Sequence, residues 1–548
     1  MNSECSDEYS HSSDDSVDDS EEEDESSEEE SDLEGMAPTP KRRKVAREKA
    51  LSASLKSGKY PNFMGVHGPT CTQQVSPIDG SVMDYLLLLW PATLCQLIAV
   101  ETNRYALQRG VSGWHDVTEA EVWTFLGIVI LMGLNRLPRI SNYWSTDCFM
   151  GIPNLHRHMS LARFWALWSN LHLVDNKSMP PTGGICRKVK PLLDTLERTF
   201  LTCYSPGQEL SVDEGMVKYK GRAGGKVCMP KKPVKWGFKV WCCSCACCGY
   251  LCTFQVYQGK PTDPITGKKT PEKGLVMRVV SELLAPFAGL NHVVYCDNYY
   301  SSAPLVDKLA EDKVFFAGTI KKCAKGFPDS LKTVQPPRGS YVSQTVGSNS
   351  FFVFQDRKQV CFVTNVFPEH MDSQVTRLQP EGVLRKQSVP PLLPAYNKFM
   401  GGVDRTGHIR KTYGFDRKSK RFWLRIFFQF FDYTIDNAYL LYKHNCRMHG
   451  TRPKDLLAFR LELVHQLLEQ VGSQRGVRAG AGKERVDTVR ENEGVCYLVP
   501  VSDVGLKRGR CRQCQRSKRM PPRSTSFACG VCRVRLCKTT CFAEFHQH

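Results

Sequence analysis

Three aspartates stand in contexts that suit metal-dependent phosphoryl chemistry. Asp213 lies in the alternating segment 208–216, which predicts a β-strand, and Asp297 lies near the end of the apolar segment 291–298, which predicts a buried strand. Asp404 follows Phe-Met-Gly-Gly-Val and precedes a basic aromatic stretch. Carboxylates from adjacent strand ends and a distant helix can hold two divalent cations, which activate water and stabilise the leaving oxygen of a phosphodiester. Any one of these aspartates alone would more often be a helix cap or a surface residue.

Basic residues flank all three aspartates. Five surround the first strand and the hairpin that follows it, namely Lys218, Lys220, Arg222, Lys235 and Lys239. Four more open the aromatic stretch 417–432 beyond Asp404, namely Arg417, Lys418, Lys420 and Arg421. We expect these side chains to contact DNA phosphates, although an ordinary solvated face is the alternative for each. The aromatic residues after them have helical spacing, which favours a packed core over base stacking.

The C-terminal tail has the cysteine and histidine spacing of a zinc module. Paired Cys-x2-Cys motifs hold thiolates close enough for one tetrahedral ion, and eight ligands suffice for two. The candidate ligands are Cys511, Cys514, Cys529, Cys532, Cys537, Cys541, His546 and His548. The pattern resembles a PHD/RING-type cross-brace, which would place Cys511, Cys514, Cys537 and Cys541 on one zinc ion and the other four ligands on the second. Free thiols are the alternative. Ubiquitin ligation and histone-tail reading are alternatives to DNA binding for such a module.

The charge of the chain favours a polyanionic partner. Its 548 residues carry a net charge of +18, and residues 1–35 contain 17 Asp or Glu and no Lys or Arg, so the remainder has 74 Lys or Arg against 39 Asp or Glu. A body this basic suits nucleic acid. The acidic leader cannot bury a core, and we expect it to be disordered. The cluster Pro-Lys-Arg-Arg-Lys-Val at 40–45 predicts a nuclear localisation signal, or else a phosphate-binding arm.

Neither a membrane span nor a disulfide framework is expected. No run of 18 uncharged apolar residues occurs, and the chain begins with an acidic segment rather than an apolar signal segment. The 24 cysteines are typical of a reducing compartment. Six of them crowd into 242–252, where zinc binding is possible. Strand alternation would point them to opposite faces, however, which favours small buried thiols.

Periodicity predicts helices first and a mixed sheet afterwards. Helical spacing covers 85–97, 119–134, 161–173 and 189–200, and Thr118 begins the second of these with acids in its first turn. Strands are expected at 209–216, 237–243, 250–259, 292–297 and 314–320, with a helix at 301–311 and a hairpin around Gly249. An inserted β segment at 338–364 precedes helices at 419–443 and 453–471. The two glycines before Asp404 permit backbone geometries that would strain other residues.

At this point the chain resembles the piggyBac family of DNA transposases, including their transposable element-derived proteins. The resemblance runs from about Phe63 to His546 and rests on many motifs in one order. They include Glu-Thr-Asn-Arg-Tyr-Ala at 101–106, Asn-Tyr-Trp-Ser at 142–145, Leu-Ser-Val-Asp-Glu at 210–214, Lys-Pro-Val-Lys-Trp-Gly-Phe-Lys at 232–239, Cys-Asp-Asn-Tyr-Tyr-Ser-Ser at 296–302 and Met-Gly-Gly-Val-Asp at 400–404.

The resemblance implies a fold, a reaction and partners. It implies an RNase H-like core in which Asp213, Asp297 and Asp404 are the catalytic ligands of two Mg²⁺ ions. It also implies cut-and-paste transposition of an element flanked by TTAA, with the zinc tail on the terminal repeats of double-stranded DNA. A homodimer in the nucleus would pair the two ends. A host-adopted DNA-binding protein with incidental catalysis is the alternative.

One departure from the family pattern stands near the third aspartate. Family members often carry a second acid three residues after the Gly-Gly-Val-Asp motif, and this chain has Gly407 there, followed by His408. That acid is not one of the three ligands, so metal binding need not change, whereas DNA handling or regulation could.

The predicted fold class is mixed α/β, with an RNase H-like core, a β insertion, a helical N-terminal domain and a small zinc domain. The predicted segments are a leader at 1–60, a helical domain at 61–204, a first core part at 205–330, an insertion at 331–390, a second core part at 391–471, a linker at 472–504 and the zinc domain at 505–548.

Overall fold

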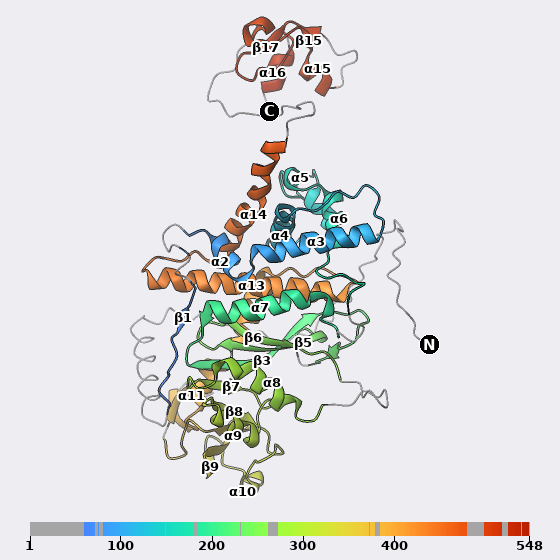
Figure 1. The fold of residues 1–548 in the computed structure, drawn as a ribbon. Coiled ribbons are helices and arrows are strands. Elements are labelled where there is room, and N and C mark those ends of the chain that lie inside the picture. Colours follow the sequence, from blue (N-terminus) through green and yellow to red (C-terminus); the bar gives the residue numbers. More distant parts are fainter. Residues whose placement is uncertain are drawn as a thin grey trace. The chain divides into compact units, whose positions relative to one another are not determined.

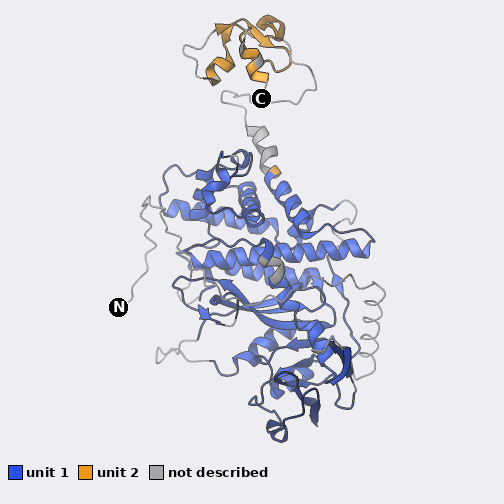
Figure 2. Ribbon diagram, turned by 180° about the vertical axis from the view of Figure 1, so that it is seen from behind, with its two compact units in different colours: residues 1–468 blue, residues 469–548 orange. Residues whose placement is uncertain are grey.

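The computed structural model describes residues 60–71, 75, 80–147, 149–179, 184–230, 232–260, 272–371, 373–378, 384–478, 498–517, 524–538 and 540–546. The chain divides into two compact units, Met1–Leu468 and Glu469–His548 (Figure 2). The predicted acidic leader and localisation cluster lie outside the described residues. The finer domain boundaries expected from the sequence stay predictions.

A nine-stranded mixed sheet forms the centre of the first unit (Figure 1). Its strands run in the order β4-β5-β3-β7-β8-β11-β10-β9, and β6 pairs with β5. β3 pairs in parallel with β7, and β7 pairs in parallel with β8, whereas β5, β6 and β11 are antiparallel to their neighbours. The core strands are β3 (Glu209–Lys218), β4 (Val227–Cys228), β5 (Trp236–Cys245), β6 (Leu251–Val256), β7 (Val293–Cys296) and β8 (Phe315–Ile320). The mixed α/β class predicted from the sequence is confirmed.

The predicted β insertion extends this sheet. β11 (Gln359–Thr364) pairs with β8, and β10 (Asn349–Gln355) and β9 (Tyr341–Val346) follow outward. Within the described residues of this insertion, β12 (Ser373–Leu378) and β13 (Leu384–Val389) pair as a separate two-stranded sheet. Both faces of β10 and β11 are thereby buried, one in each of two hydrophobic core clusters.

Helices before the sheet form a layer that packs on the long helix α13 (Phe422–Met448). They are α2 (Val82–Leu89), α3 (Ala92–Gln108), α4 (Glu119–Leu134), α5 (Leu155–His158), α6 (Leu161–Asn170) and α7 (Lys190–Cys203), with short 3-10 turns at Ile140–Trp144 and Arg187–Val189. A two-stranded sheet joins β1 (Gly68–Pro69) to β2 (Tyr204–Ser205). The helix predicted over 85–97 is wrong as one element. Pro91 splits it, because the residue before a proline disfavours helical geometry.

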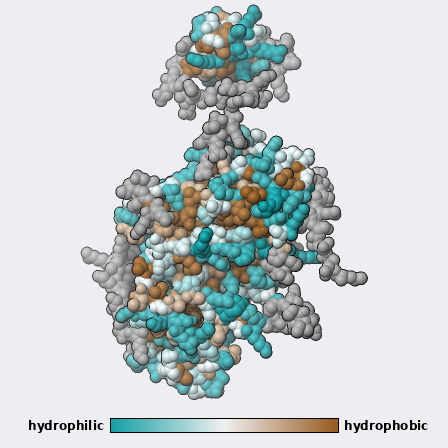
Figure 3. Space-filling view, viewed as in Figure 1, coloured by the Kyte–Doolittle hydropathy of each residue, from teal (hydrophilic) through white to brown (hydrophobic). Residues whose placement is uncertain are grey.

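The remaining helices of the first unit follow β6 in the chain. They are α8 (Leu275–Leu284), a 3-10 turn at Ala285–Phe287, α9 (Ala303–Glu311), α10 (Asp329–Lys332), α11 (Leu393–Phe399), α12 (Gly402–Tyr413) and α14 (Leu456–Arg478). α13 is buried along almost its whole length, and its aromatic side chains belong to the main core, as predicted. One face of this unit shows polar residues around smaller apolar areas (Figure 3).

The second unit is small. It contains β14 (Leu498–Pro500), a 3-10 turn at Val501–Val504, β15 (Gly509–Arg510), α15 (Arg512–Arg516), β16 (Ser524–Thr525), β17 (Phe527–Cys529) and α16 (Thr540–His546). β14 pairs with β17, and β15 pairs with β16. Four of the five residues in its buried apolar cluster are cysteines.

Across the described residues, no single helix has both the length and the hydropathy of a membrane span, although α2 and α3 together meet that test as a pair bent by 67°.

Candidate active site and metal centres

The sheet brings two of the three predicted aspartates side by side. In the parallel ladder of β3 and β7, Val212 pairs with Cys296, and Asp213 and Asp297 each follow by one residue. In parallel strands, residues that follow paired positions lie next to each other, so the Asp213 and Asp297 carboxylates lie at the same end of the two strands. The Asp213 carboxylate is 5% exposed and accepts a hydrogen bond from the Glu214 amide at 2.7 Å. Asp297 is half-buried and accepts one from the Tyr299 amide at 2.8 Å.

A close approach of α12 to β3 positions the third aspartate. A side chain at Gly402 would have its Cβ 2.8 Å from Ser211 Cβ and 3.1 Å from Ala246 Cα, so only glycine fits there. The Ser211 hydroxyl donates a hydrogen bond to the Met400 carbonyl just before the helix. Asp404 therefore lies in the first turn of α12, on its exposed side. The expectation of an unusual backbone at these glycines is wrong, because neither Gly401 nor Gly402 has positive φ. Gly402 is needed for space, whereas a Cβ at Gly401 would meet nothing within 4 Å.

Lys232 occupies the centre of the acidic site. Its Nζ lies 3.6 Å from Asp213 Oδ2 and 3.3 Å from Glu214 Oε1. Burial is the largest single effect on the pKa of Lys232, and it lowers that pKa. The charges of Asp213, Glu214 and Asp404 together outweigh burial, so the pKa of Lys232 is raised. Lys239 Nζ lies 3.6 Å from Glu214 Oε2, and the Tyr300 hydroxyl donates to the same oxygen at 2.6 Å. The site thus contains two ammonium groups as well as its acids.

Burial controls the protonation of the carboxylates. Removal from water raises the pKa of Asp213 to about 7, while the Lys232 charge opposes that rise. The pKa of Asp297 is also raised, first by burial. The pKa of Glu214 is lowered, because the Tyr300 hydrogen bond and the Lys239 and Lys232 charges outweigh its burial. Carboxylate oxygens such as those of Asp213, Asp297 and Asp404 are the ligands that divalent cations take, and a bound cation would favour their ionised form, so the residues present fit a divalent metal.

The predicted DNA-contacting residues fall into two groups. Lys220, Arg222, Lys235, Lys418 and Lys420 are exposed, and Lys218 is half-exposed with its Nζ 3.1 Å from Asp416 Oδ2. The other three are more buried and contact other parts of the protein. Lys239 is 8% exposed and lies over the Tyr299 ring at 4.2 Å. Arg417 donates to the Pro138 carbonyl at 3.0 Å and to the Tyr143 hydroxyl at 2.6 Å, and Arg421 donates to the Ser169 carbonyl at 3.2 Å. These contacts join the start of α13 to the helical layer.

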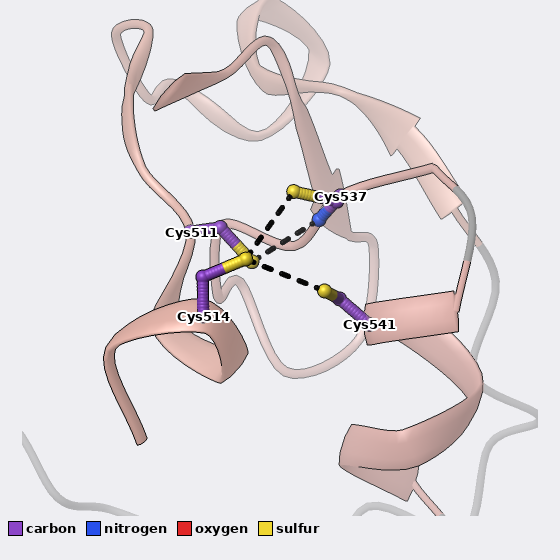
Figure 4. Close-up of side chains that lie close together, drawn as sticks. All are labelled: Cys511, Cys514, Cys537 and Cys541. Carbon is purple, nitrogen blue, oxygen red and sulfur yellow. Dashed lines mark hydrogen bonds between the residues drawn. The ribbon is translucent and has the colours of Figure 1, made fainter. Parts of the chain in front are cut away.

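Four cysteines converge in the tail (Figure 4). Cys511, Cys514, Cys537 and Cys541 place their sulfur atoms within 4.8 Å of one another. Cys514 Sγ lies 3.5 Å from Cys541 Sγ and 3.9 Å from Cys537 Sγ, and the Cys537 amide donates to Cys511 Sγ at 3.3 Å. Four thiols at this spacing could bind one tetrahedral zinc ion. The grouping is the one that the cross-brace pattern predicted.

A second group in the tail comprises Cys529, Cys532 and His546. Cys532 Sγ lies 3.5 Å from His546 Nε2, and the Cys532 amide donates to Cys529 Sγ at 3.3 Å. His546 Nδ1 is hydrogen-bonded to the Phe542 carbonyl at 2.8 Å, which orients Nε2 towards the cysteines. The predicted fourth ligand, His548, lies outside the described residues. Within the described chain these two groups are the places where three such ligand atoms gather this closely.

A family model described as Transposase IS4 matches residues 81–439, which include all three aspartates. The chain belongs to the piggyBac transposase family. Over 460 residues it is 27% identical to the human piggyBac transposable element-derived protein 3, an alignment that covers 82% of this chain and 74% of the relative. Over 439 residues it is 25% identical to the human piggyBac transposable element-derived protein 5, covering 76% and 80%.

The fold is also similar to a solved transposase. A chain from the cryo-EM structure of the piggyBac transposase synaptic complex with hairpin DNA superposes with a TM-score of 0.65. The match covers 87% of this chain and 100% of that one at 21% sequence identity. The family suggests a DNA-cleaving transposase that uses divalent metal, and the tail clusters could bind zinc.

Sequence reasoning missed Lys232 and Glu214 as parts of the acidic site. Glu214 directly follows Asp213, and Lys232 opens the motif at 232–239, so both stood in segments that carry the resemblance. Nothing in their local pattern shows that a loop lysine reaches β3 across the intervening residues. The assignment of Asp213, Asp297 and Asp404 as metal ligands stays a prediction.

Proposed function

We propose that this protein is a DNA transposase that cuts and joins phosphodiesters at the ends of an element flanked by TTAA. The main support is that Asp213 and Asp297 directly follow the paired residues Val212 and Cys296 of β3 and β7, in a chain of the piggyBac family. The strand order β5-β3-β7-β8, antiparallel on one side and parallel on the other, supports an RNase H-like core.

The acidic residues have distinct tasks in this proposal. Asp213 and Asp297, with Asp404 from the start of α12, would hold two Mg²⁺ ions, which supply an activated water and charge neutralisation at the leaving oxygen. Asp213 must be ionised to do so, and its pKa of about 7 makes that readily reached at neutral pH. Lys232 holds the Asp213 carboxylate in place and lies where it can also meet a phosphate oxygen.

DNA contacts and assembly follow from the surface. Lys220, Arg222, Lys235, Lys418 and Lys420 present exposed cations on the segments that flank the acidic site. The tail would hold two structural Zn²⁺ ions and bind the terminal repeats, because its described surface is rich in arginine and lysine. A homodimer would bring two ends together, and the basic cluster at 40–45 would direct the protein to the nucleus.

A second function deserves a test because the relatives are named transposable element-derived proteins. In this reading the chain binds DNA with the same fold, and its acidic site has no role in the host. The ion pairs of Lys232 with Asp213 and Glu214 favour this alternative, since they stabilise the site without any metal.

An excision assay separates the two functions. The substrate is a TTAA-flanked cassette that carries the inverted repeats found beside the gene. We expect excision with the intact protein, a loss of at least 1,000-fold with Asp297→Asn as removal of a metal ligand implies, and wild-type activity with Asp194→Asn, an exposed aspartate on α7. DNA binding by gel shift should be the same for all three. If the intact protein binds these ends and excises nothing, the second function holds instead.

Deletion of residues 505–548 tests the role of the tail. We expect repeat-specific binding to disappear while a weak, salt-sensitive affinity for any duplex remains, because the exposed cations of the first unit are still present. Unchanged specificity in the truncated protein would contradict the assigned role.

A further inference from the structure

A cluster of thiol and imidazole groups lies at the end of the β5–β6 hairpin, far along the chain from the tail. The turn from Cys245 to Tyr250 contains Cys245, Cys247 and Cys248, and Gly249 there has φ of 86°. His67 reaches the same place from the segment that forms β1, because β1 pairs with β2 and so runs alongside Tyr204. Four potential soft-metal ligands therefore come from two distant parts of the chain.

The hydroxyl of Tyr204 lies among these ligands. It is hydrogen-bonded to His67 Nε2 at 2.9 Å, to Cys248 Sγ at 3.2 Å and to Cys245 Sγ at 3.7 Å. Three ligand atoms thus surround one buried oxygen atom. Since each lies within 3.7 Å of that oxygen, small movements of the side chains would bring them to the separations found around a tetrahedral ion.

The fourth ligand lies beside the other three. The Cys245 thiol lies within hydrogen-bonding reach of Cys247, Cys248 and His67. Cys247 and His67 both lie beside Gly207, because a Cβ built there would be 3.6 Å from Cys247 Sγ and 3.6 Å from His67 Nε2. Cys245 is buried, Cys248 is half-buried and Cys247 is exposed, so a metal ion can enter from the side of Cys247.

We propose that Cys245, Cys247, Cys248 and His67 form a third zinc site, separate from the acidic site and from the tail. Three thiolates and one imidazole are a common donor set for structural Zn²⁺. The set is looser than the tail clusters, and Tyr204 would give up its hydrogen bonds to these ligands when the ion binds. This site explains why half of the cysteines in 242–252 gather at the turn, whereas Cys242, Cys243 and Cys252 are buried in the strands as the sequence predicted.

The turn that carries these cysteines also holds the helix of Asp404. Arg405 donates to the carbonyls of Ala246 and Cys247, the latter at 3.3 Å, and the Thr406 hydroxyl donates to the Gly249 carbonyl at 2.5 Å. An ion bound at the turn would therefore hold in place the carbonyl groups to which Arg405 and Thr406, in the first turn of α12, are hydrogen-bonded. His67 would at the same time be attached to the hairpin, so that residues before α2 are held on the core.

Thiol labelling of the full-length wild-type protein tests the site without any substitution. The protein is loaded with Zn²⁺, treated with an alkylating reagent in reducing buffer, and mapped by mass spectrometry with and without a chelator. We expect Cys247 and Cys248 to react at least tenfold more slowly with zinc than without, while the exposed Cys228 and Cys323 react at the same rate in both. Equal rates at Cys247 with and without zinc would overturn the proposal.

Zinc content gives an independent measurement. Purified Cys245→Ser/Cys248→Ser should contain one zinc ion fewer per chain than the wild type, and His67→Gln should bind this ion more weakly. The control Cys228→Ser/Cys323→Ser changes two exposed cysteines elsewhere and should keep the wild-type content. An unchanged content in the first variant would show that the cluster is not a zinc site.

Discussion

The acidic site of the first unit and the cysteine clusters of the second are built in opposite ways. Asp213 and Asp297 stand on strands whose neighbours belong to a large apolar core, so their positions are set by packing and by the β3–β7 ladder. In the second unit the buried cluster consists of Cys511, Cys514, Cys529 and Cys541 with Leu536. There the candidate ligands are themselves the core.

The electrostatics differ in the same sense. Lys232 lies against the carboxylates of the first unit and compensates their charge, so this site can fold before a metal ion binds. The tail thiols of the first cluster have mainly one another as close partners. A metal ion is therefore expected to bind the first unit after it has folded, whereas the second unit is expected to need its metal ions in order to fold.

The largest effect is expected from removal of tail ligands. Cys514→Ser/Cys541→Ser should lose one zinc ion and the fold of residues 498–546, because apparent zinc binding of about 10–16 kcal/mol is also folding free energy in such modules. Limited proteolysis should digest the tail and leave the first unit intact. The control Cys323→Ser should behave as wild type. A protease-resistant tail without zinc would remove the distinction between the units.

A buried ion pair should matter more to the first unit than any metal ion. Arg460 is fully buried, with its guanidinium 2.6 Å from Asp436 Oδ1 and 3.6 Å from Asp432 Oδ1. Arg460→Met leaves both carboxylates without their cation, which should lower the unfolding free energy of this unit by about 3–5 kcal/mol. Arg278→Met, which removes a more exposed pair with Glu272, should cost about 0–1 kcal/mol. Denaturant unfolding followed by tryptophan fluorescence measures both, and equal effects would contradict the argument.

The pH dependence of the first unit should report Asp213. Its pKa of about 7 lies above the usual value, so the folded state binds the proton more tightly than the unfolded chain. This contribution to stability is present at low pH and is lost as the pH rises from about 4 to about 7. Between pH 5 and pH 8 without metal, the unfolding free energy should fall by roughly 3 kcal/mol more in the wild type than in Asp213→Asn.

Added Mg²⁺ should oppose this loss, since it binds the ionised carboxylate. Its stabilising effect on the wild type should grow from pH 6 to pH 8 and be weaker in Asp213→Asn. A wild-type profile parallel to that of the variant would show that the Asp213 carboxyl is not held protonated by burial.

The smallest effect comes from a helix cap in the first unit. The Thr118 hydroxyl accepts from the Glu121 amide at 3.2 Å, and the Glu121 carboxylate accepts from the Thr118 amide at 3.3 Å. Thr118→Ala should reduce stability by about 1 kcal/mol, while Thr118→Ser keeps the hydroxyl and most of the effect. Chemical denaturation resolves this difference, and neither change should alter the zinc content of the tail.

Much of the fold could be predicted because the patterns involved are local. The helix at Glu119–Leu134 appears with its expected start at Thr118, and the strand that contains Asp213 appears at Glu209–Lys218. Apolar spacing and caps act within a few residues, so one sequence suffices to read them. The break at Pro91 was equally local, and the rule for prolines would have found it.

What could not be predicted depends on distant parts of the chain meeting. Lys232 reaches Asp213 through a loop, and no periodicity encodes that contact. Arg417 and Arg421 lie in a charge run typical of a DNA-binding surface, yet they bond to carbonyls of the helical layer. Gly402 was expected to provide a backbone conformation that other residues avoid. Its actual role is to lack a side chain, because α12 packs closely on Ser211.

The alignment of Asp213 on β3 with Asp297 after β7 restricts where the chain can accept inserted residues. Successive residues of a strand face opposite sides of the sheet, so one residue inserted between Glu209 and Ser211 would turn Ser211 away from α12 and Asp213 away from Asp297. The segment 219–226 connects β3 to β4 without setting this alignment. A library of single insertions should therefore show a short intolerant stretch on β3 followed by a permissive loop.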